Sequence, residues 1–185
     1  MRLTEKKEAG NMKKLEDYIR TIRDFPKPGI LFRDVTGVMA DPFGFQLALE
    51  SYCDALDGTA FDVVAGVESR GFIFGAPLAL RLGKSFLPVR KAGKLPGRTL
   101  SESYDLEYGR ATLQVHADDV KTGARVVVVD DLLATGGTVH AAARLIERLG
   151  AHVVKYVFLI ELDDLGGRNR LPPGSVVSLT HFPGH

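Results

Sequence analysis

The chain has 185 residues, of which 45% are hydrophobic and 25% are charged, and its formal net charge is +1. This composition excludes disordered and fibrous classes, and a nearly neutral chain is poorly suited to bind nucleic acid through a broad positive surface. The one cysteine cannot form an internal disulfide bond, and no segment approaches the roughly 20 apolar residues of a membrane span. We therefore expect a cytoplasmic protein with no nucleic-acid or membrane partner, in which a flexible tail, residues 1–14, precedes a single domain, residues 15–185.

The N-terminal third contains two helical patterns separated by a loop. Apolar residues at helical spacing predict a short helix over residues 15–22. Residues 25–34, FPKPGILFRD, have two prolines and a glycine in their first half and predict a stiff loop that presents apolar side chains. Asp41, followed by proline, predicts the N-cap of a second helix, which continues to Gly58.

The rest of the chain alternates strand and helix patterns. Strands are expected at residues 61–67, 85–90, 113–115, 126–129, 153–160 and 176–179, and helices at residues 72–82 and 139–149. This order predicts an α/β fold, with a mainly parallel central sheet and helices on both faces. Because such sheets bind ligands at the carboxyl ends of their strands, the loops after Val67 and Val129 are the expected site.

The segment after Val129 has the character of an anion site. It reads DDLLATGGT, and a helix pattern follows at once, so that two glycines precede unpaired helical amides that attract a phosphate. The adjacent carboxylates of Asp130 and Asp131 would repel each other unless a polar or cationic group lay between them. Neither GxxxxGK[ST] nor GxGxxG occurs, which excludes two familiar nucleotide loops. The alternative is a tight turn in which an aspartate caps the helix.

Basic residues suggest two further parts of the site. The turn after Val67 contains Arg70, whose guanidinium matches phosphate oxygens, although it could also be an ordinary surface arginine. Residues 84–101 contain five basic residues and no acidic one. We expect the later, glycine- and proline-rich part of this segment to be irregular and to form a mobile lid over an anionic substrate. The alternative is a solvated hairpin tip.

The five histidines are expected to be exposed and to form no metal-binding set.

The segment VVVVDDLLATGGT, residues 126–138, resembles the diphosphoribosyl-binding motif of the type I phosphoribosyltransferases. Four other segments, FPKPGILFRD, GVESRGFIFG, VRKAGKLPG and YDLEYG, are similar to segments of the adenine-specific members of that family and occur in the same order. The resemblance covers residues 15–162. It implies the type I phosphoribosyltransferase fold with a small base-binding hood near residues 25–34. It also implies a purine salvage enzyme that transfers the 5-phosphoribosyl group of phosphoribosyl diphosphate to adenine, giving AMP and diphosphate.

The resemblance also implies roles for individual residues. Asp130 and Asp131 would bind the ribose hydroxyls, and the 5-phosphate would be held by Ala134, Thr135, Gly136, Gly137 and Thr138. The diphosphate would lie against Glu68, Ser69, Arg70, Gly71, Arg90, Lys91 and Lys94. Phe32 would stack on the base, while the backbones of Leu31 and Arg33 read its edge. Glu107, beside Tyr108, would handle the proton of the purine ring. The implied catalytic residues are Glu107, Arg70, Asp130 and Asp131.

The same resemblance implies Mg²⁺, held mainly through the substrate rather than by direct protein ligands, and a homodimer. Two alternatives remain open from the sequence. One is a phosphoribosyltransferase for another purine base, and the other is a purine-sensing regulator with the same fold. The regulator would need a DNA-binding domain, and about fourteen residues before the first predicted helix are too few for one.

Overall fold

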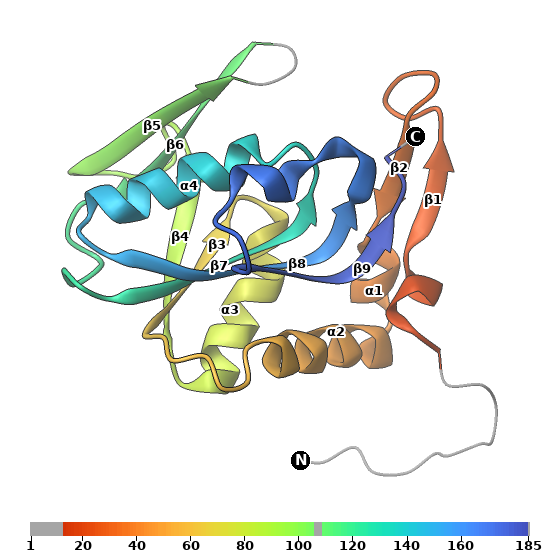
Figure 1. The fold of residues 1–185 in the computed structure, drawn as a ribbon, viewed down its shortest axis with the longest axis horizontal. Helices are drawn as coiled ribbons and strands as arrows, with labels where there is room; N and C mark the ends of the chain where they lie inside the picture. The colour runs from red at the N-terminus through yellow and green to blue at the C-terminus, as the bar shows by residue number, and fades with distance from the viewer. Residues whose placement is uncertain (1–12, 106–108, 185) are drawn as a thin grey trace.

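The computed structural model describes residues 13–105 and 109–184, so the predictions for Glu107, Tyr108 and most of the N-terminal tail fall outside the described residues. Its main feature is a seven-stranded sheet in the order β5-β6-β4-β3-β7-β8-β9 (Figure 1). The strands are β3 Val63–Val67, β4 Ser85–Lys91, β5 Thr99–Asp105, β6 Arg110–His116, β7 Arg125–Leu133, β8 His152–Leu162 and β9 Val176–Phe182. The five strands β4, β3, β7, β8 and β9 pair in parallel. Strand β6 pairs antiparallel with both β4 and β5. The mainly parallel α/β sheet is therefore confirmed.

Helices cover both faces of this sheet (Figure 1). Helix α4, Gly137–Arg148, lies on one face, and α2, Pro42–Ala55, and α3, Arg70–Leu82, lie on the other. The four consecutive valines of β7 alternate between two cores. Val126 and Val128 face the α4 side, and Val127 and Val129 face the α2–α3 side, all fully buried. A strand covered on both faces buries every side chain, which explains its unbroken apolar run.

Strand β7 extends further than the sequence predicts. Its pairing with β3 ends at Gly66 and Val129, but its pairing with β8 continues to Leu133 and Glu161. The interpretation of the segment after Val129 as a loop is therefore wrong up to Leu133. Asp130 and Asp131 lie in the final part of a strand, beyond the last residue that pairs with β3.

The N-terminal predictions are wrong in part. Residues 15–22 do not form one helix: a 3-10 turn, η1 Leu15–Tyr18, is followed by strand β1, Arg20–Arg23. The predicted loop ends in strand β2, Leu31–Asp34, which pairs antiparallel with β1. These two strands and their connection, residues 20–34, form the hood. Pairing to a partner distant in sequence overrides the helical spacing, because short apolar runs fit either structure.

Two further elements were not predicted. Helix α1, Thr36–Ala40, follows the hood, and β5 occupies residues 99–105, part of which was expected to be irregular. β5 forms a hairpin with β6, and all seven of its residues have partners there. The irregular part of this region is limited to residues 92–98, which we call the lid loop. None of the described helices is long and apolar enough to cross a membrane.

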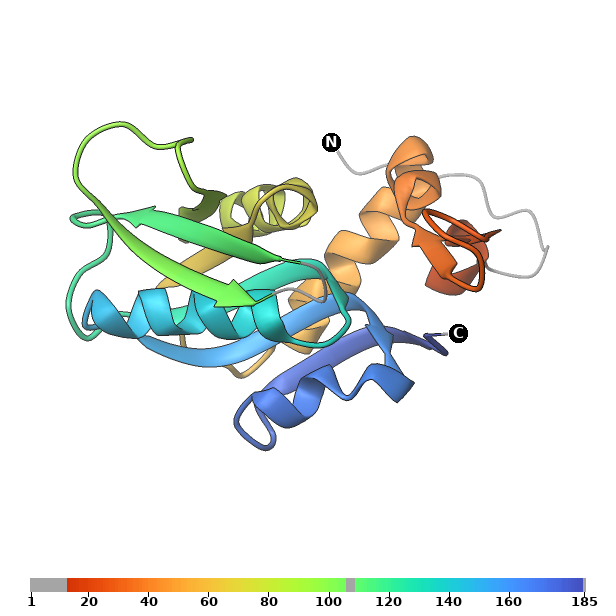
Figure 2. The same ribbon diagram turned by 90° about the horizontal axis from the view of Figure 1, so that it is seen from above.

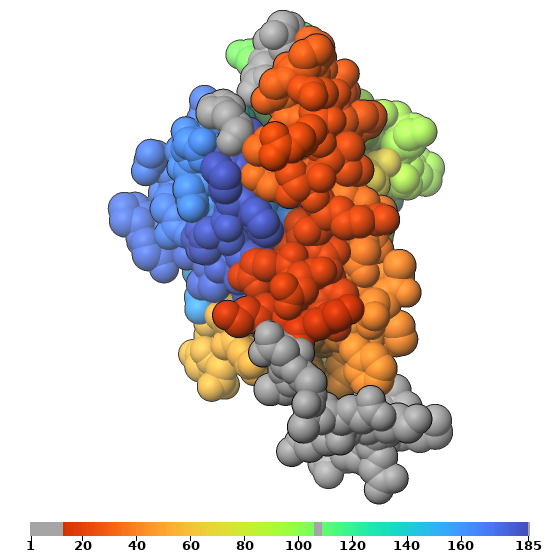
Figure 3. Space-filling model, turned by 90° about the vertical axis from the view of Figure 1, so that its right-hand side faces the viewer, coloured from red at the N-terminus to blue at the C-terminus, as the bar shows by residue number. Residues whose placement is uncertain are grey.

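The hood and the β5–β6 hairpin lie at opposite ends of the sheet (Figure 2). The hood contacts the C-terminal segment that follows β9, and the two are adjacent on the molecular surface (Figure 3). The Arg33 side chain, 8% exposed, makes this link. Its Nη2 donates to the carbonyl oxygen of Pro183 at 2.9 Å, and its guanidinium lies 4.8 Å from the ring centre of Phe182. This buried contact fixes the hood against the sheet.

The predicted N-cap of α2 is confirmed and allows a stability test. The Asp41 carboxylate accepts hydrogen bonds from the amides of Phe43 and Gly44 at 2.8 and 3.1 Å. We expect Asp41→Ala to lower the free energy of unfolding by about 1 kcal/mol, because two helical amides lose their acceptor. Urea denaturation measures this difference. Asp54→Ala, an exposed carboxylate on the same helix, is the control; an equal loss in both variants would contradict the capping role.

Candidate active site

A cavity of about 610 Å³ opens at the carboxyl ends of β3 and β7. It brings together residues from four separate parts of the chain. The lining residues are Glu68, Ser69, Arg70, Lys91, Tyr104, Ala111, Asp130, Asp131, Leu132, Leu133, Ala134, Thr135, Gly136, Gly137, Thr138 and Val139. Most of the residues predicted to bind the phosphoribosyl group are among them. The lining does not include Gly71, Arg90, Lys94 or the hood residues Leu31, Phe32 and Arg33.

Asp130 and Asp131 are held firmly by their surroundings. The carbonyl oxygen of Asp130 accepts a hydrogen bond from the hydroxyl of buried Tyr52 at 3.0 Å, and its Oδ1 accepts one from the amide of Asp131 at 2.9 Å. Gly71 packs against the same residue, because a Cβ there would lie 2.9 Å from Asp130 Oδ1. Gly71 therefore packs against the Asp130 carboxylate without lining the cavity.

The environment of the two carboxylates opposes their ionisation. Burial, together with the charge of Asp131, raises the pKa of Asp130 well above the usual range. Burial also raises the pKa of Asp131, which is 4% exposed, while the positive charge of Arg70 opposes that rise. Such a pair favours a ligand that brings hydrogen-bond donors or a cation.

Arg70 links the carboxylates to the hood. Its Nε lies 2.6 Å from Asp131 Oδ2, and its guanidinium lies 5.8 Å from the ring centre of Phe32. Phe32 in turn packs edge to face against Phe25, with ring centres 5.1 Å apart. Phe32 therefore lies beside Arg70, at the hood side of the cavity. Its ring is a nearby apolar surface to which a planar ligand could bind.

We call Ala134–Thr138 the phosphate loop, after the role that the resemblance implies for it; it runs from the end of β7 into the start of α4. Gly136 has φ of +79°, a conformation that favours glycine, and it caps the twelve-residue helix α4. No acidic residue occupies the first turn of that helix, so its amides present an unopposed positive end to the cavity. The Thr138 hydroxyl donates to the Tyr104 hydroxyl at 3.2 Å, which joins the loop to the β5–β6 hairpin. This geometry would suit an anion, and the anion site predicted from the sequence stays a prediction.

The turn after β3 engages the base of the lid loop. Glu68 accepts hydrogen bonds through Oε2 from the Lys91 amide at 2.9 Å and from Arg90 Nε at 3.2 Å. Although burial raises the pKa of Glu68, these hydrogen bonds lower it below the usual value. Arg90 also donates to the Lys94 carbonyl oxygen at 3.0 Å. Glu68 and Arg90 therefore bind each other, and Lys91 is the member of the basic segment that lines the cavity. The peptide bond between Glu68 and Ser69 is cis.

The carboxylates of the cavity fit a hard divalent cation such as Mg²⁺. Oδ2 of Asp131 makes no hydrogen bond of good geometry with any described residue, although Arg70 is its ion-pair partner. Carboxylate oxygens combined with ligand oxygens are the donors that Mg²⁺ prefers.

A second group, Glu161, Asp163 and His181, has ligand atoms within 4.8 Å of one another. In this group the Arg168 guanidinium forms an ion pair with Glu161, and its positive charge opposes the binding of a cation there.

Sequence reasoning missed several lining residues. Tyr104 is the most informative of them, because its hydroxyl contacts the phosphate loop. It belongs to the YDLEYG segment, in which roles were predicted only for Glu107 and Tyr108. The signal available in the sequence was the position of a tyrosine at the end of a basic, glycine-rich segment. Leu132 and Leu133 line the cavity as part of the extension of β7, which was not predicted, and Val139 lines it from the first turn of α4.

The fold and this site define a class: an α/β protein in which two strand-end carboxylates and a helix N-terminus share one cavity. The family model described as "Phosphoribosyl transferase domain" matches residues 46–177. A protein from Butyrivibrio fibrisolvens called adenine phosphoribosyltransferase is 61% identical over 160 residues, covering 86% of this chain and 89% of the relative.

Two solved structures are also similar. Adenine phosphoribosyltransferase from Thermoanaerobacter pseudethanolicus has a TM-score of 0.88 and 52% identity, over 91% of this chain and 100% of that one. The enzyme from Saccharomyces cerevisiae, complexed with D-2,5-dideoxy-2,5-imino-altritol 1,6-bisphosphate and adenine, has a TM-score of 0.85 and 40% identity, over 89% and 96%. The chain therefore belongs to the adenine phosphoribosyltransferases, a branch of the phosphoribosyltransferase family of transferase enzymes.

The raised pKa of Asp130 predicts a conflict between stability and activity. A carboxyl group whose pKa rises on folding binds its proton more tightly in the folded state, so stability falls as pH increases through the folded pKa. We expect Asp130→Asn to be more stable than the wild type at pH 8, with the difference shrinking as pH falls and vanishing below about pH 3, where the carboxyl is mostly protonated in both states. Turnover should fall at least ~tenfold if Asp130 binds the ribose hydroxyls, as the resemblance implies.

Urea denaturation without ligand at several pH values, together with steady-state rates, tests both parts. Asp118→Asn is the control, because the side chain of Asp118 is 75% exposed. Equal stability of Asp130→Asn and wild type at pH 8 would contradict the burial argument. Undiminished turnover would contradict the ribose assignment. Asp131→Asn should lose activity to a similar extent.

Proposed function

We propose that this enzyme transfers the 5-phosphoribosyl group of phosphoribosyl diphosphate to adenine, giving AMP and diphosphate, a step of purine salvage. The observation that carries the proposal is the juxtaposition, in one cavity, of two strand-end carboxylates and the N-terminus of α4. A phosphorylated sugar matches both features at once, because its hydroxyls donate to carboxylates and its phosphate accepts from amides. The adenine and bisphosphate bound by the yeast relative support the same substrates.

The carboxylates and the phosphate loop position the sugar. Asp130 and Asp131 accept hydrogen bonds from the two ribose hydroxyls, and the amides and hydroxyls of residues 134–138 hold the 5-phosphate. Fixing the sugar at two points aligns its anomeric carbon with the base and removes much of the entropic barrier. As diphosphate departs, the sugar ring gains positive character. The two carboxylates stabilise that charge.

Arg70 has a different partner at each stage. Without substrate it neutralises Asp131, with the two charged atoms 2.6 Å apart. When ribose hydroxyls bind to Asp131, the guanidinium is free to hold diphosphate oxygens through its planar set of donors. Lys91, whose amide binds Glu68 two residues before Arg70, adds a second positive charge. Both cations stabilise the leaving group as its negative charge grows.

Mg²⁺ is proposed as the cofactor, with Asp130 and Asp131 close to it and the substrate supplying most of its ligands. When bound, it supplies positive charge that stabilises the departing diphosphate. Glu107 is proposed to hold or move the proton on the purine ring. Lys94, in the lid loop, is proposed to approach the diphosphate when the loop closes. A cytoplasmic location and a homodimer remain predictions, and light scattering coupled to size-exclusion chromatography measures the second.

The hood is proposed to bind the base. Strand β2 pairs only with β1 among the described residues, so the backbone groups of its other edge have no strand partner. Residues Leu31 and Arg33, two apart, direct their backbone groups to the same edge of the strand. A carbonyl and an amide there pair with the 6-amino group and N1 of adenine. Phe32 stacks on the ring system.

This arrangement predicts a strong preference for adenine. A 6-oxopurine reverses the donor and acceptor at the two recognised positions, which leaves two buried pairs mismatched. We expect kcat/KM to be at least about 10³-fold higher for adenine than for hypoxanthine, guanine or xanthine. Wild-type protein with phosphoribosyl diphosphate and Mg²⁺ is assayed with each base in turn. Comparable values for adenine and any 6-oxopurine would defeat the backbone-reading account, and no nucleotide from any base would defeat the proposed function.

The lid loop predicts substrate-dependent protection from protease. Lys94 and Arg98 are exposed, and the glycines of residues 92–98 allow the loop to change conformation. We expect trypsin to cut after Lys94 or Arg98 readily in the free protein and at least about fivefold more slowly with phosphoribosyl diphosphate and Mg²⁺ present. Mass spectrometry of the fragments measures the rates. Lys121, exposed in a turn elsewhere, is the internal control; equal protection at both places would remove loop closure from the mechanism.

A further inference from the structure

The connection between β8 and β9 lies directly against the phosphate loop, although no motif marks it in the sequence. Its first part consists of two 3-10 turns, η2 Asp163–Leu165 and η3 Gly167–Arg170, joined by Gly166. We call residues 163–170 the buttress. It lines no part of the active-site cavity. Its contacts with the loop are backbone to backbone.

Two glycines make this close approach possible. A Cβ on Gly136 would lie 2.6 Å from the carbonyl oxygen of Gly167, a distance that real Cβ atoms essentially never show. A Cβ on Gly167 would overlap the carbonyl oxygen of Ala134 and lie 3.0 Å from the amide nitrogen of Gly136. Gly167 is buried, and its φ is not in the left-handed region. Glycine is therefore required at position 167 by contact with the loop and not by backbone conformation.

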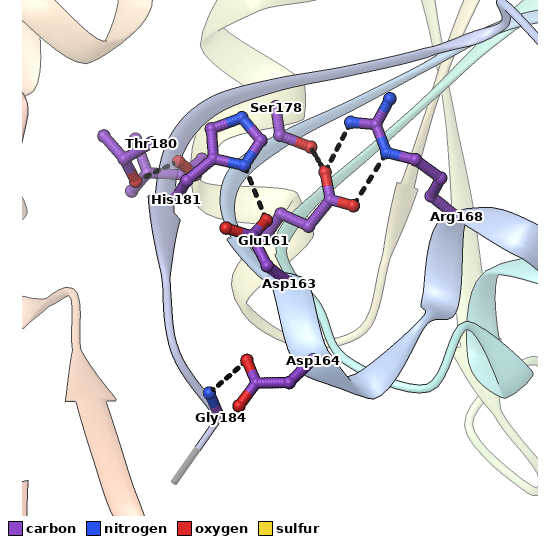
Figure 4. A network of polar contacts seen from close by, with 9 residues as sticks. Glu161, Asp163, Asp164, Arg168, Ser178, Thr180, His181 and Gly184 are labelled. Carbon is purple, nitrogen blue, oxygen red and sulfur yellow. Dashed lines mark hydrogen bonds and ion pairs between the residues drawn. The ribbon is translucent and has the colours of Figure 1, made fainter.

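An ion pair beside this contact anchors the buttress to the sheet. Arg168 donates through Nε and Nη2 to the two carboxylate oxygens of Glu161, at 2.8 and 2.6 Å, and Ser178 donates to the same carboxylate at 2.5 Å (Figure 4). The Glu161 side chain is only 5% exposed. The hydrogen bonds from Arg168, together with one from Ser178, lower the pKa of Glu161, so this carboxylate is ionised at neutral pH.

The ion pair lies beside the start of the phosphate loop. Glu161 on β8 is the partner of Leu133 on β7, the last strand residue before Ala134. Ser178 comes from the next strand, β9, and Leu171, which follows η3, is buried in the core beneath α4. The buttress is thus fixed at its end by Leu171 and at Arg168 by the ion pair, so Gly167 cannot move away from the loop without breaking one of them.

We propose that Gly167, Arg168 and Glu161 are positioning residues for the 5-phosphate site: the ion pair holds Gly167 against the phosphate loop, and Gly167 fixes the loop backbone in its binding conformation. Amides bind a phosphate well only when they already point to one centre, because the free energy of ordering them otherwise reduces affinity. The inference rests on the proposed function for the identity of the ligand. It assigns the contribution to ground-state binding of the sugar phosphate rather than to the chemical step or to the base.

The central test compares Gly167→Ala and Arg168→Met with two matched controls. Gly44→Ala also adds a Cβ to a buried glycine, 2.8 Å from the Tyr18 ring and remote from the cavity. Arg125→Met removes a bidentate arginine, 46% exposed, which pairs with Asp62. We measure KM for phosphoribosyl diphosphate and for adenine, kcat, the thermal midpoint, and the Kd of ribose 5-phosphate by calorimetry.

We expect Gly167→Ala to raise the KM for phosphoribosyl diphosphate and the Kd of ribose 5-phosphate about tenfold, and Arg168→Met about fivefold, with the KM for adenine within about twofold of the wild type. The controls should lower the thermal midpoint and leave both sugar-phosphate constants unchanged. If Gly167→Ala does not fold, Arg168→Met decides the question. Folded variants with wild-type Kd for ribose 5-phosphate would overturn the proposal, as would parallel changes in the KM of both substrates.

The calorimetric measurement separates this inference from the proposed function. Wild-type protein that binds ribose 5-phosphate but makes no nucleotide from any base contradicts the proposed function and leaves the buttress testable. Wild-type protein that makes AMP, with both variants unchanged, overturns the buttress alone.

Discussion

The active site depends on one feature of the sheet, which is that β7 continues beyond the point where β3 ends. Pairing between the two strands stops at Gly66 and Val129, whereas β7 stays paired with β8 as far as Leu133. The edge left open by β3 is filled by the first turn of α3, where Gly71 packs against Asp130. Two carboxylates are thereby held on rigid strand backbone, beside the N-termini of two helices. A loop of the same sequence would not fix them so firmly.

The buried charges of the cavity are unfavourable in the free protein, and the same charges determine which ligand it binds. Burial opposes ionisation of the two aspartates, and the positive charge of Arg70, which is paired with Asp131, compensates for part of that cost at both of them. The N-terminus of α4, which has no acidic residue in its first turn, lines the same cavity. A ligand with hydroxyl donors at one end and a phosphate at the other satisfies both regions simultaneously. This is the general pattern in which a functional site retains unfavourable electrostatics that a ligand relieves.

Three elements lie outside the centre of the sheet, and each makes a small number of specific contacts that fix its position. The hood is joined to the C-terminal segment by the buried Arg33 side chain, and the β5–β6 hairpin contacts the phosphate loop through Tyr104. The buttress contacts the same loop through Gly167 and is secured by the Arg168–Glu161 pair. The central sheet supplies the chemistry. These attachments determine how accurately its groups face the substrate and the base.

The sequence by itself determined the parallel α/β core, the phosphate loop and the pair of aspartates, because strand burial, helix capping and an anion site each depend on residues adjacent in the chain. Only the tertiary structure decided the rest. The apolar spacing of residues 15–22 favours a helix, but pairing with β2 makes residues 20–23 a strand. The extension of β7 to Leu133 depends on β8, and the need for glycine at position 167 depends on a backbone thirty residues away in the phosphate loop. Contacts between distant segments leave no local pattern, so residues that act through them become visible only when the chain is folded.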